Sequence, residues 1–513
     1  MGLLKTGMLS PAIAKLSSIR RFPPIETLSR TAVFALITIC AASAWPQAGV
    51  EVQTGEPVFS LERCLQFAMD HSRELRDARL GLDVAEKQVR EAWGEVFPTV
   101  DASLTLTRNL TDQVTFVPAI FFDPTASPDE QVGVRFSSDN LWNTTVSLEQ
   151  PLFQAEAFIG VGAAARFRAL QVERVRGSSH RVATSVRTHY YEMLLARENA
   201  RLTQESLRRV ETTLAGAIGL ERAGLGSSYD VLRLEVELAK LQPNLRRARN
   251  ALQEAERDLK VEMGLGVGEP IEITGSLHTM DLEEPQANSS ENLDLLRVAG
   301  VRVLGEEDGD RLLGITRARR SDLLQARLET SLARTQLSAE RATVYPKLLA
   351  FASYRVDAQE DGSLDFFGEN DMQRTTNWQA GIRLEVPVWE GGKRYSRMAQ
   401  RSLQLDQSLT QERLQEQEVE NEVRTLLAQL VEARHRVEVQ KRAVEQAQRG
   451  FEIASAEYRE GLGTQINATD AEVALRETEF NYAEAIFDVL RVQAQLDAAV
   501  GVVPMVDEIE EGP

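Results

Sequence analysis

Apolar residues recur every seven positions over four long stretches of this 513-residue chain. Two series, at residues 186–214 and 231–259, lie in the first half, and two more, at residues 423–458 and 468–496, lie in the second. A strict seven-residue repeat keeps one apolar seam turned towards a partner helix. About seventy helical residues extend roughly 100 Å, far longer than a globular helix. The pattern therefore predicts long helices packed as antiparallel coiled coils.

A short glycine-containing turn separates the two helices of each predicted pair, at about residues 222–230 and 459–467. Glycine tolerates the positive φ that ends a helix, and a hydroxyl or carboxamide caps the next one. An ordinary helical hairpin needs the same residues, so only their position at the end of a long coil makes them candidates for docking a partner. These residues are Gly224, Gly226, Ser227, Asp230, Gly461, Gly463, Thr464 and Asn467.

Four segments of about ten residues alternate apolar and polar side chains, at about 98–108, 141–150, 347–356 and 377–387. This alternation is typical of outer-membrane barrel strands, although a soluble hairpin with one wet face shows it too. The third segment fits least well, because Leu349 and Phe351 fall on its polar face. Four strands cannot close a barrel, and an open edge is not tolerated in lipid, so we expect several chains to pool their strands.

The two halves of the chain match each other in order and spacing. Leu75 and Phe97-Pro98 correspond to Leu323 and Tyr345-Pro346, and the segments 151–224 and 387–461 differ in length by one residue. The chain is therefore interpreted as a tandem duplication. The expected divisions are a first repeat at residues 45–263, an equatorial insertion at 264–320, a second repeat at 321–501 and a C-terminal tail at 502–513.

Residues 1–44 have the features of a signal peptide. Arginines precede a short apolar run at residues 31–44, which ends in Ala42-Ser43-Ala44, a match to an A-x-A cleavage site. Cys40 raises the alternative of a lipidated N-terminus, but Ile39 is a poor residue before a lipidated cysteine. No later run reaches eighteen apolar residues, so any insertion into a membrane must come from strands.

Composition and scattered motifs argue against several other classes. The net charge of −19 disfavours a nucleic-acid partner, since phosphate binding needs clustered positive charge. His180 and His189 are spaced wrongly to share one helical face as metal ligands, and no nucleophile lies in a recognisable catalytic motif. We expect no catalytic, cofactor-binding or metal site, and hence no enzyme.

These motifs taken together resemble the TolC-like outer-membrane efflux protein family. They include Ser60-Leu61-Glu62, the Phe97-Pro98 junction, the segment 386–392 and the two glycine turns, and the resemblance covers about residues 58–501. The resemblance implies a mainly α fold with a small β part. It also implies a homotrimer, in which a twelve-stranded barrel in the outer membrane continues into a periplasmic tunnel of twelve helices.

The resemblance further implies the exit duct of a tripartite efflux or type I secretion system. The helical tips would dock to a periplasmic adaptor and an inner-membrane pump of the RND or ABC type. A lumenal gate would fall at Tyr458, Asn467 and Asp470, where Asn467 departs from the aspartate of the family pattern. The alternative is a periplasmic coiled-coil adaptor or scaffold without a barrel, which leaves the four amphipathic segments unexplained.

Overall fold

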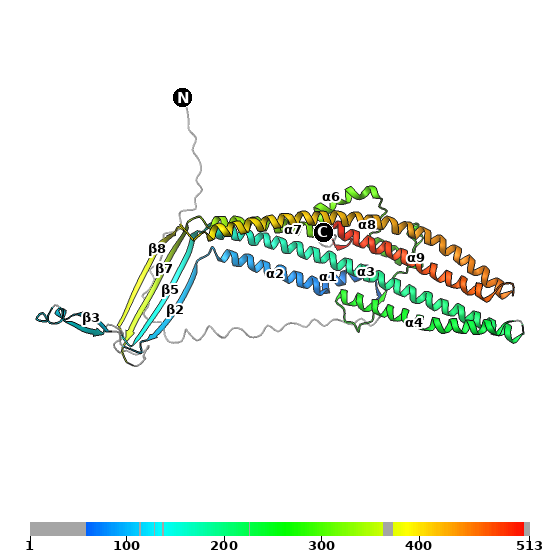
Figure 1. Ribbon diagram of the computed structural model, residues 1–513, viewed down its shortest axis with the longest axis horizontal. Helices are drawn as coiled ribbons and strands as arrows, with labels where there is room; N and C mark the ends of the chain where they lie inside the picture. The colour runs from blue at the N-terminus through cyan, green and yellow to red at the C-terminus, as the bar shows by residue number, and fades with distance from the viewer. Residues whose placement is uncertain are drawn as a thin grey trace, which may run out of the picture. The chain divides into compact units, whose positions relative to one another are not determined.

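The computed structural model describes residues 58–111, 114–127, 129–135, 138–224, 226–362 and 373–506. All of them fall in the unit that spans residues 56–513. The predicted signal peptide, Cys40, residues 363–372 of the loop between the third and fourth predicted strands, and the end of the tail at 507–513 lie outside the described residues. The described chain is mainly helical, with one four-stranded antiparallel sheet (Figure 1).

The helices confirm the tandem duplication. Each repeat has the same four helices in the same order, with lengths of 11, 22, 68 and 36 residues in the first and 11, 22, 67 and 36 in the second. They are α1 (Leu61–His71), α2 (Arg73–Gly94), α3 (Ala155–Arg222) and α4 (Ser228–Met263), and then α6 (Gly309–Arg319), α7 (Ser321–Ala342), α8 (Lys393–Arg459) and α9 (Gln465–Val500). No helix in the described part of the chain combines the length and apolarity that a membrane crossing requires.

The order of the helices favours an earlier start of the second repeat than the expected boundary after residue 320. That boundary separates α6 from α7, which are the counterparts of α1 and α2, so we place the start at Gly309. One extended residue breaks the helix in each case, Ser72 in the first repeat and Arg320 in the second. The match of Leu75 with Leu323 showed from sequence that α2 and α7 correspond. The shorter helices before them, α1 and α6, share too little sequence pattern to be recognised as counterparts.

The insertion between the repeats joins the main core of the molecule. Its strand β6 (Glu272–Ile273) pairs in parallel with β1 (Val58–Phe59), and its helix α5 (Ser290–Val298) contributes buried Leu295. The core continues through α3, α8 and α9, where side chains such as Val186, Leu430 and Leu490 are fully buried. The insertion therefore packs where the two repeats meet.

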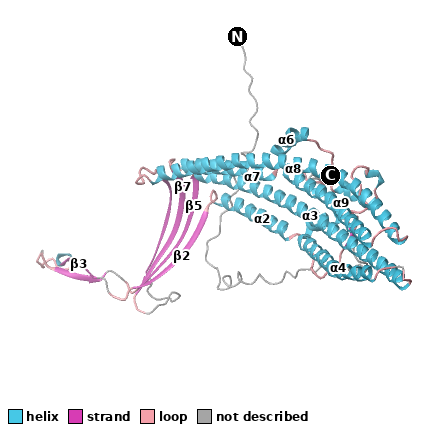
Figure 2. Ribbon diagram, turned by 45° about the vertical axis from the view of Figure 1, so that its right-hand side comes forward, coloured by secondary structure: helices cyan, strands magenta, loops and turns pink. Residues whose placement is uncertain are grey.

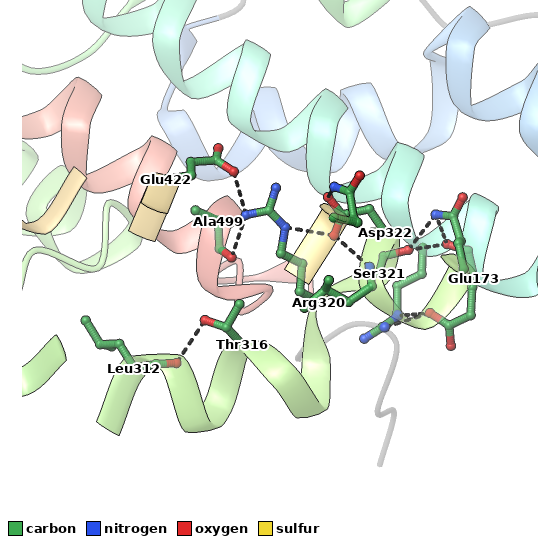
Figure 3. A network of polar contacts seen from close by, with 12 residues as sticks. Glu173, Leu312, Thr316, Arg320, Ser321, Asp322, Glu422 and Ala499 are labelled. Carbon is green, nitrogen blue, oxygen red and sulfur yellow. Dashed lines mark hydrogen bonds and ion pairs between the residues drawn. The ribbon is translucent and has the colours of Figure 1, made fainter. Parts of the chain in front are cut away.

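A polar network holds the start of α7 against three long helices (Figure 3). The Arg320 guanidinium donates to the Ala499 carbonyl of α9 at 3.1 Å and lies 2.7 Å from the Glu422 carboxylate of α8. The Ser321 hydroxyl donates to the Glu173 carbonyl of α3. Arg320 thus joins the start of α7 to α8 and α9 of its own repeat, and Ser321 ties it to α3 of the first repeat.

The sheet has the order β2-β5-β7-β8, and its strands lead directly into the helices (Figure 2). They span β2 (Thr99–Arg108), β5 (Asn140–Phe153), β7 (Lys347–Glu360) and β8 (Gln373–Glu385), so β5 and β7 are longer than the sequence pattern indicated. Within the described ranges, the two end strands, β2 and β8, each pair with one neighbour only. Their side chains are almost all exposed, whereas those of central β7 are mostly half-buried.

The register of the sheet gathers apolar side chains on one face. One row of directly paired residues is Val100, Leu148, Ala352 and Ala380, and the next is Ala102, Val146, Tyr354 and Trp378. The alternate row is polar and consists of Asp101, Ser147, Ser353 and Gln379. Because successive strand residues point to opposite faces, the sheet has one apolar and one polar surface.

Phe351, which interrupts the predicted alternation, has a specific place on the polar face. It pairs with Gly381, where a Cβ would lie 2.9 Å from the phenyl ring. The Arg383 guanidinium lies 5.1 Å from the centre of the same ring. The missing side chain of Gly381 thus leaves room for Phe351, and Arg383 makes a cation–π contact with the ring.

The loop between β2 and β5 contains a small separate hairpin, which was not predicted from the sequence. It is formed by β3 (Val114–Pro118) and β4 (Gln131–Arg135). Several of its large apolar side chains are exposed, among them Phe116, Phe121 and Phe122.

Candidate functional site

The two glycine turns join the helices of each hairpin with the same backbone geometry. Gly224 has φ +73° and Gly461 has φ +71°, values that residues with a Cβ rarely adopt. The amide of Gly226 donates to the Leu220 carbonyl at 3.0 Å, and the amide of Gly463 donates to the Glu457 carbonyl at the same distance. Both turns therefore close the ends of α3 and α8 as helix C-terminal motifs.

The second glycine of each turn has a separate, steric role. A Cβ on Gly226 would lie 2.9 Å from the backbone nitrogen of Glu221. A Cβ on Gly463 would lie 3.0 Å from the Cβ of Glu457. The chain passes so close to the helix it has just left that a side chain fits poorly at either position.

Hydroxyl groups cap the helices that follow the turns. The Ser227 hydroxyl accepts from the Tyr229 amide at 3.2 Å, and the Thr464 hydroxyl accepts from the Asn467 amide at 3.3 Å. Asp230 lies in the first turn of α4, where its charge is favourable beside the helix N-terminus. The first turn of α9 has no acidic residue, because Asn467 takes the corresponding place.

The three gate candidates lie on the second hairpin close to its turn. Tyr458 is in the last turn of α8, while Asn467 and Asp470 are three residues apart on α9 and therefore share a face. Asn467 and Asp470 are exposed in the single chain. Burial raises the pKa of Tyr458. The negative charge of Asp230, a tip residue of the other hairpin, raises it further.

A cavity of about 720 Å³ lies between the two hairpins just above the turns. All four long helices line it, with Val210 from α3, Leu234 from α4, Phe451 and Tyr458 from α8, and Ala468 from α9. Phe451 and Tyr458 both fall on the seven-residue series at 423–458, but this spacing does not predict that the seam opens into a cavity.

Arg209 of α3 lies at this cavity and was not among the predicted site residues. Its Nε is 3.3 Å from Glu472 Oε1, and its Nη2 is 3.6 Å from Glu479 Oε2, both on α9. Its guanidinium carbon lies 5.8 Å from the centre of the Phe451 ring on α8. Charged residues on long helices are usually solvated, so sequence alone could not single out this arginine.

Two features of the described residues concern metal ligands and nucleophiles. No group of three or more His, Cys, Asp or Glu side chains among them is arranged to hold a metal ion. Cys64 is buried in the core, and burial raises the pKa of its thiol to about 12. A thiol with that pKa is a poor nucleophile at neutral pH.

The model of the family described as "outer membrane efflux protein" matches residues 64–265 and 312–502. The alkaline protease secretion protein AprF of Pseudomonas aeruginosa is 24% identical over 364 residues, which cover 71% of this chain and 70% of AprF. The probable outer membrane lipoprotein SilC of Salmonella typhimurium is 21% identical over 439 residues, which cover 82% of this chain and 80% of SilC.

The fold is also that of a solved channel protein. The structure of CusC, reported in a study of transmembrane channel formation, superposes with a TM-score of 0.66 at 16% identity and covers 86% of this chain and 92% of CusC. The family match covers both repeats and leaves out most of the insertion between them. The chain belongs to the outer membrane efflux protein family.

Proposed function

We propose that this outer-membrane protein is the exit duct of a tripartite efflux or type I secretion system and that it assembles as a homotrimer. The observation that carries the proposal is the sheet, which has one apolar face and, in the part of the chain that the structure describes, unpaired edges on both β2 and β8. In lipid, the backbone N–H and C=O groups of such edges would have no partner. Pairing β8 of one copy with β2 of the next would satisfy them.

The proposed number of copies follows from the number of strands that a barrel needs in order to enclose a lumen. Two copies of the four-stranded sheet would supply eight strands, and an eight-stranded barrel is just wide enough for its own side chains to fill. Three copies would supply twelve strands and leave room for a lumen. The apolar rows would then face lipid, and the polar rows would line the passage.

The helical hairpins would form the periplasmic part of the duct. Four long helices from each of three copies, α3, α4, α8 and α9, would make a tunnel of twelve. We place the docking surface for a periplasmic adaptor and an RND or ABC pump at the tips, and the gate at Tyr458, Asn467 and Asp470. The duct would be passive, with substrates chosen by the inner-membrane transporter.

Extraction from membranes separates this proposal from a periplasmic scaffold that never enters lipid. A scaffold leaves washed membranes in high salt, because only surface contacts hold it. We expect this protein to resist high salt, to require detergent and to have the mass of a trimer in detergent. Release by salt as a monomer would support the scaffold instead.

A further inference from the structure

The cavity between the two hairpins has the size and lining of a small-molecule site. Its volume of about 720 Å³ lies within the range of roughly 300–1,000 Å³ that is typical of pockets for small organic ligands. Buried Val210, Leu234 and Ala468 supply aliphatic surface. The half-buried rings of Phe451 and Tyr458 are seven residues apart on α8, so both face the cavity from the same side of that helix. The lining therefore offers a surface on which an aromatic ligand can pack.

The charge of this lining is opposite to that of the whole chain. Three arginines line the cavity, Arg208 and Arg209 from α3 and Arg459 from α8. Glu472 is the one acidic side chain among the described residues that line it. The full chain, by contrast, has 77 acidic and 58 basic residues. The cavity is thus a local concentration of positive charge, which attracts anions.

Two of the three arginines have no carboxylate partner within the protein. Arg209 Nε lies 3.3 Å from Glu472 Oε1, so these two charges largely offset each other. Arg208 and Arg459 form no ion pair with any residue that the structure describes, and Arg459 donates only to the Ser455 carbonyl of its own helix, at 3.2 Å. Since Arg208 and Arg459 belong to different hairpins, two unpaired guanidinium groups approach the cavity from its two sides.

Further donors at the cavity have hydrogen-bonding capacity to spare. Nη2 of Arg209 is buried and has no hydrogen-bond partner in the described part of the chain. The Thr469 hydroxyl accepts from Gln465 Nε2 at 2.6 Å, which leaves its own proton available to donate. Guanidinium groups bind carboxylates especially well, because two parallel N–H groups match the two oxygens.

We propose that this cavity binds a small aromatic carboxylate, whose charged group is held by Arg208 and Arg459 and whose ring packs on Phe451 and Tyr458. The inference goes beyond the proposed duct, because all of the lining residues belong to one chain and binding requires neither a membrane nor a pump. It assigns a ligand class to a site that no gate or docking role explains.

Calorimetric titration of the purified full-length protein in detergent with 2-naphthoate tests the site, with the same titration into empty micelles subtracted. We expect saturable binding of one molecule per chain. The neutral amide 2-naphthamide keeps the ring system but lacks the charge, so it should bind about tenfold more weakly or worse. Equal affinity for the two compounds would show that the arginines do not recognise the ligand.

A pair of arginine variants separates a local role from general electrostatics. Arg208→Gln/Arg459→Gln should weaken binding of 2-naphthoate by about tenfold or more and leave that of 2-naphthamide unchanged. Arg222→Gln/Arg449→Gln is the matched control, because it removes one positive charge from each of α3 and α8 at exposed positions that do not line the cavity. It should bind 2-naphthoate like wild type, and an equal loss in both double variants would refute the roles assigned to Arg208 and Arg459.

Filling the cavity gives a second test that leaves every charge in place. Gly216 of α3 lines the cavity, and nothing lies within 4 Å of a Cβ built there, so Gly216→Phe should fold normally and block the ligand. Gly219→Phe adds the same side chain at an equally open position of α3 outside the lining and should bind like wild type. Circular dichroism of both variants should match wild type.

The outcomes also distinguish this inference from the proposed function. If wild type shows no saturable binding of 2-naphthoate, or if Gly216→Phe binds it as tightly as Gly219→Phe, the assigned site is wrong. A protein that binds 2-naphthoate as described but carries no current in a bilayer would support the site and refute the duct.

Discussion

Arg187 of the first repeat and Asp497 of the second form a fully buried ion pair, with 2.9 Å between Nη2 and Oδ2. The same Nη2 donates to the Ala299 carbonyl of the insertion at 2.6 Å, and the other oxygen of Asp497 accepts from Gln493 at 2.9 Å. Burial raises the pKa of Asp497, and the positive charge of Arg187 opposes that rise. Arg187 of α3 is thus joined both to α9, through Asp497, and to the insertion, through Ala299.

Asp497→Asn should destabilise the protein strongly. It would leave the Arg187 guanidinium buried without a carboxylate, and breaking a buried ion pair in this way costs about 3–5 kcal/mol. We expect a clear fall in the thermal midpoint of the helical circular dichroism signal. Replacing both partners, as in Arg187→Met/Asp497→Leu, should cost less than the single change. Equal losses in the two variants would show that the charge left behind is not the cause.

Gly501→Ala should also destabilise, through backbone contact. Gly501 has φ +79°, and a Cβ there would lie 2.7 Å from the Cα of Arg320, at the break between α6 and α7. Overpacking of this kind typically costs about 1–3 kcal/mol. Gly450→Ala is the matched control, since nothing lies within 4 Å of a Cβ at that helical position. A thermal midpoint for Gly501→Ala no lower than that of Gly450→Ala would contradict the predicted clash.

Gly461→Val should abolish export but leave the oligomer intact. The positive φ of Gly461 is strained for a β-branched residue, so the tip turn should change shape while the strands and the main core stay as they are. Export of a substrate from cells and native mass of the oligomer are the two measurements. Gly450→Val adds the same side chain on α8 away from the turn and should preserve export. If Gly461→Val loses the oligomer as well, the assignment of the tip as a docking surface fails.

Asp470→Asn should weaken the block of channel current by divalent cations. Three copies of Asp470 would bring three carboxylates near the lumen, and their removal lowers the local negative potential. Asn467→Asp should act in the opposite direction, because it would add a second ring of carboxylates one helical turn away. Blocking curves of purified channels measure both effects. Unchanged block in both variants would remove this pair of positions from the gate.

Much of the fold could be predicted from residue spacing, because seven-residue and two-residue periods report directly on which face of a helix or strand is covered. Val186 and Val423, which lie on two of the predicted seams, are fully buried in the structure. Val100, in the first alternating segment, pairs with Leu148 on the apolar face of the sheet. The glycines of the two turns were also found, since positive φ demands a particular residue type.

Other features depend on which elements pack together, and periodicity does not contain that information. The contact of Arg209 with α8 and α9 joins residues more than 200 positions apart, and a charged residue on a long helix gives no sign of such a partner. The placement of Phe351 over Gly381 likewise needs the strand register. The β3–β4 hairpin was missed because its two strands are only five residues each.

The most direct test of the account is to measure the native mass of the detergent-purified protein and its ion current in a planar lipid bilayer. If the apolar face of the sheet meets lipid and β2 and β8 pair between copies, the oligomer should have three times the mass of the mature chain and should conduct in discrete steps. A monomer that stays soluble without detergent and carries no current would contradict the account.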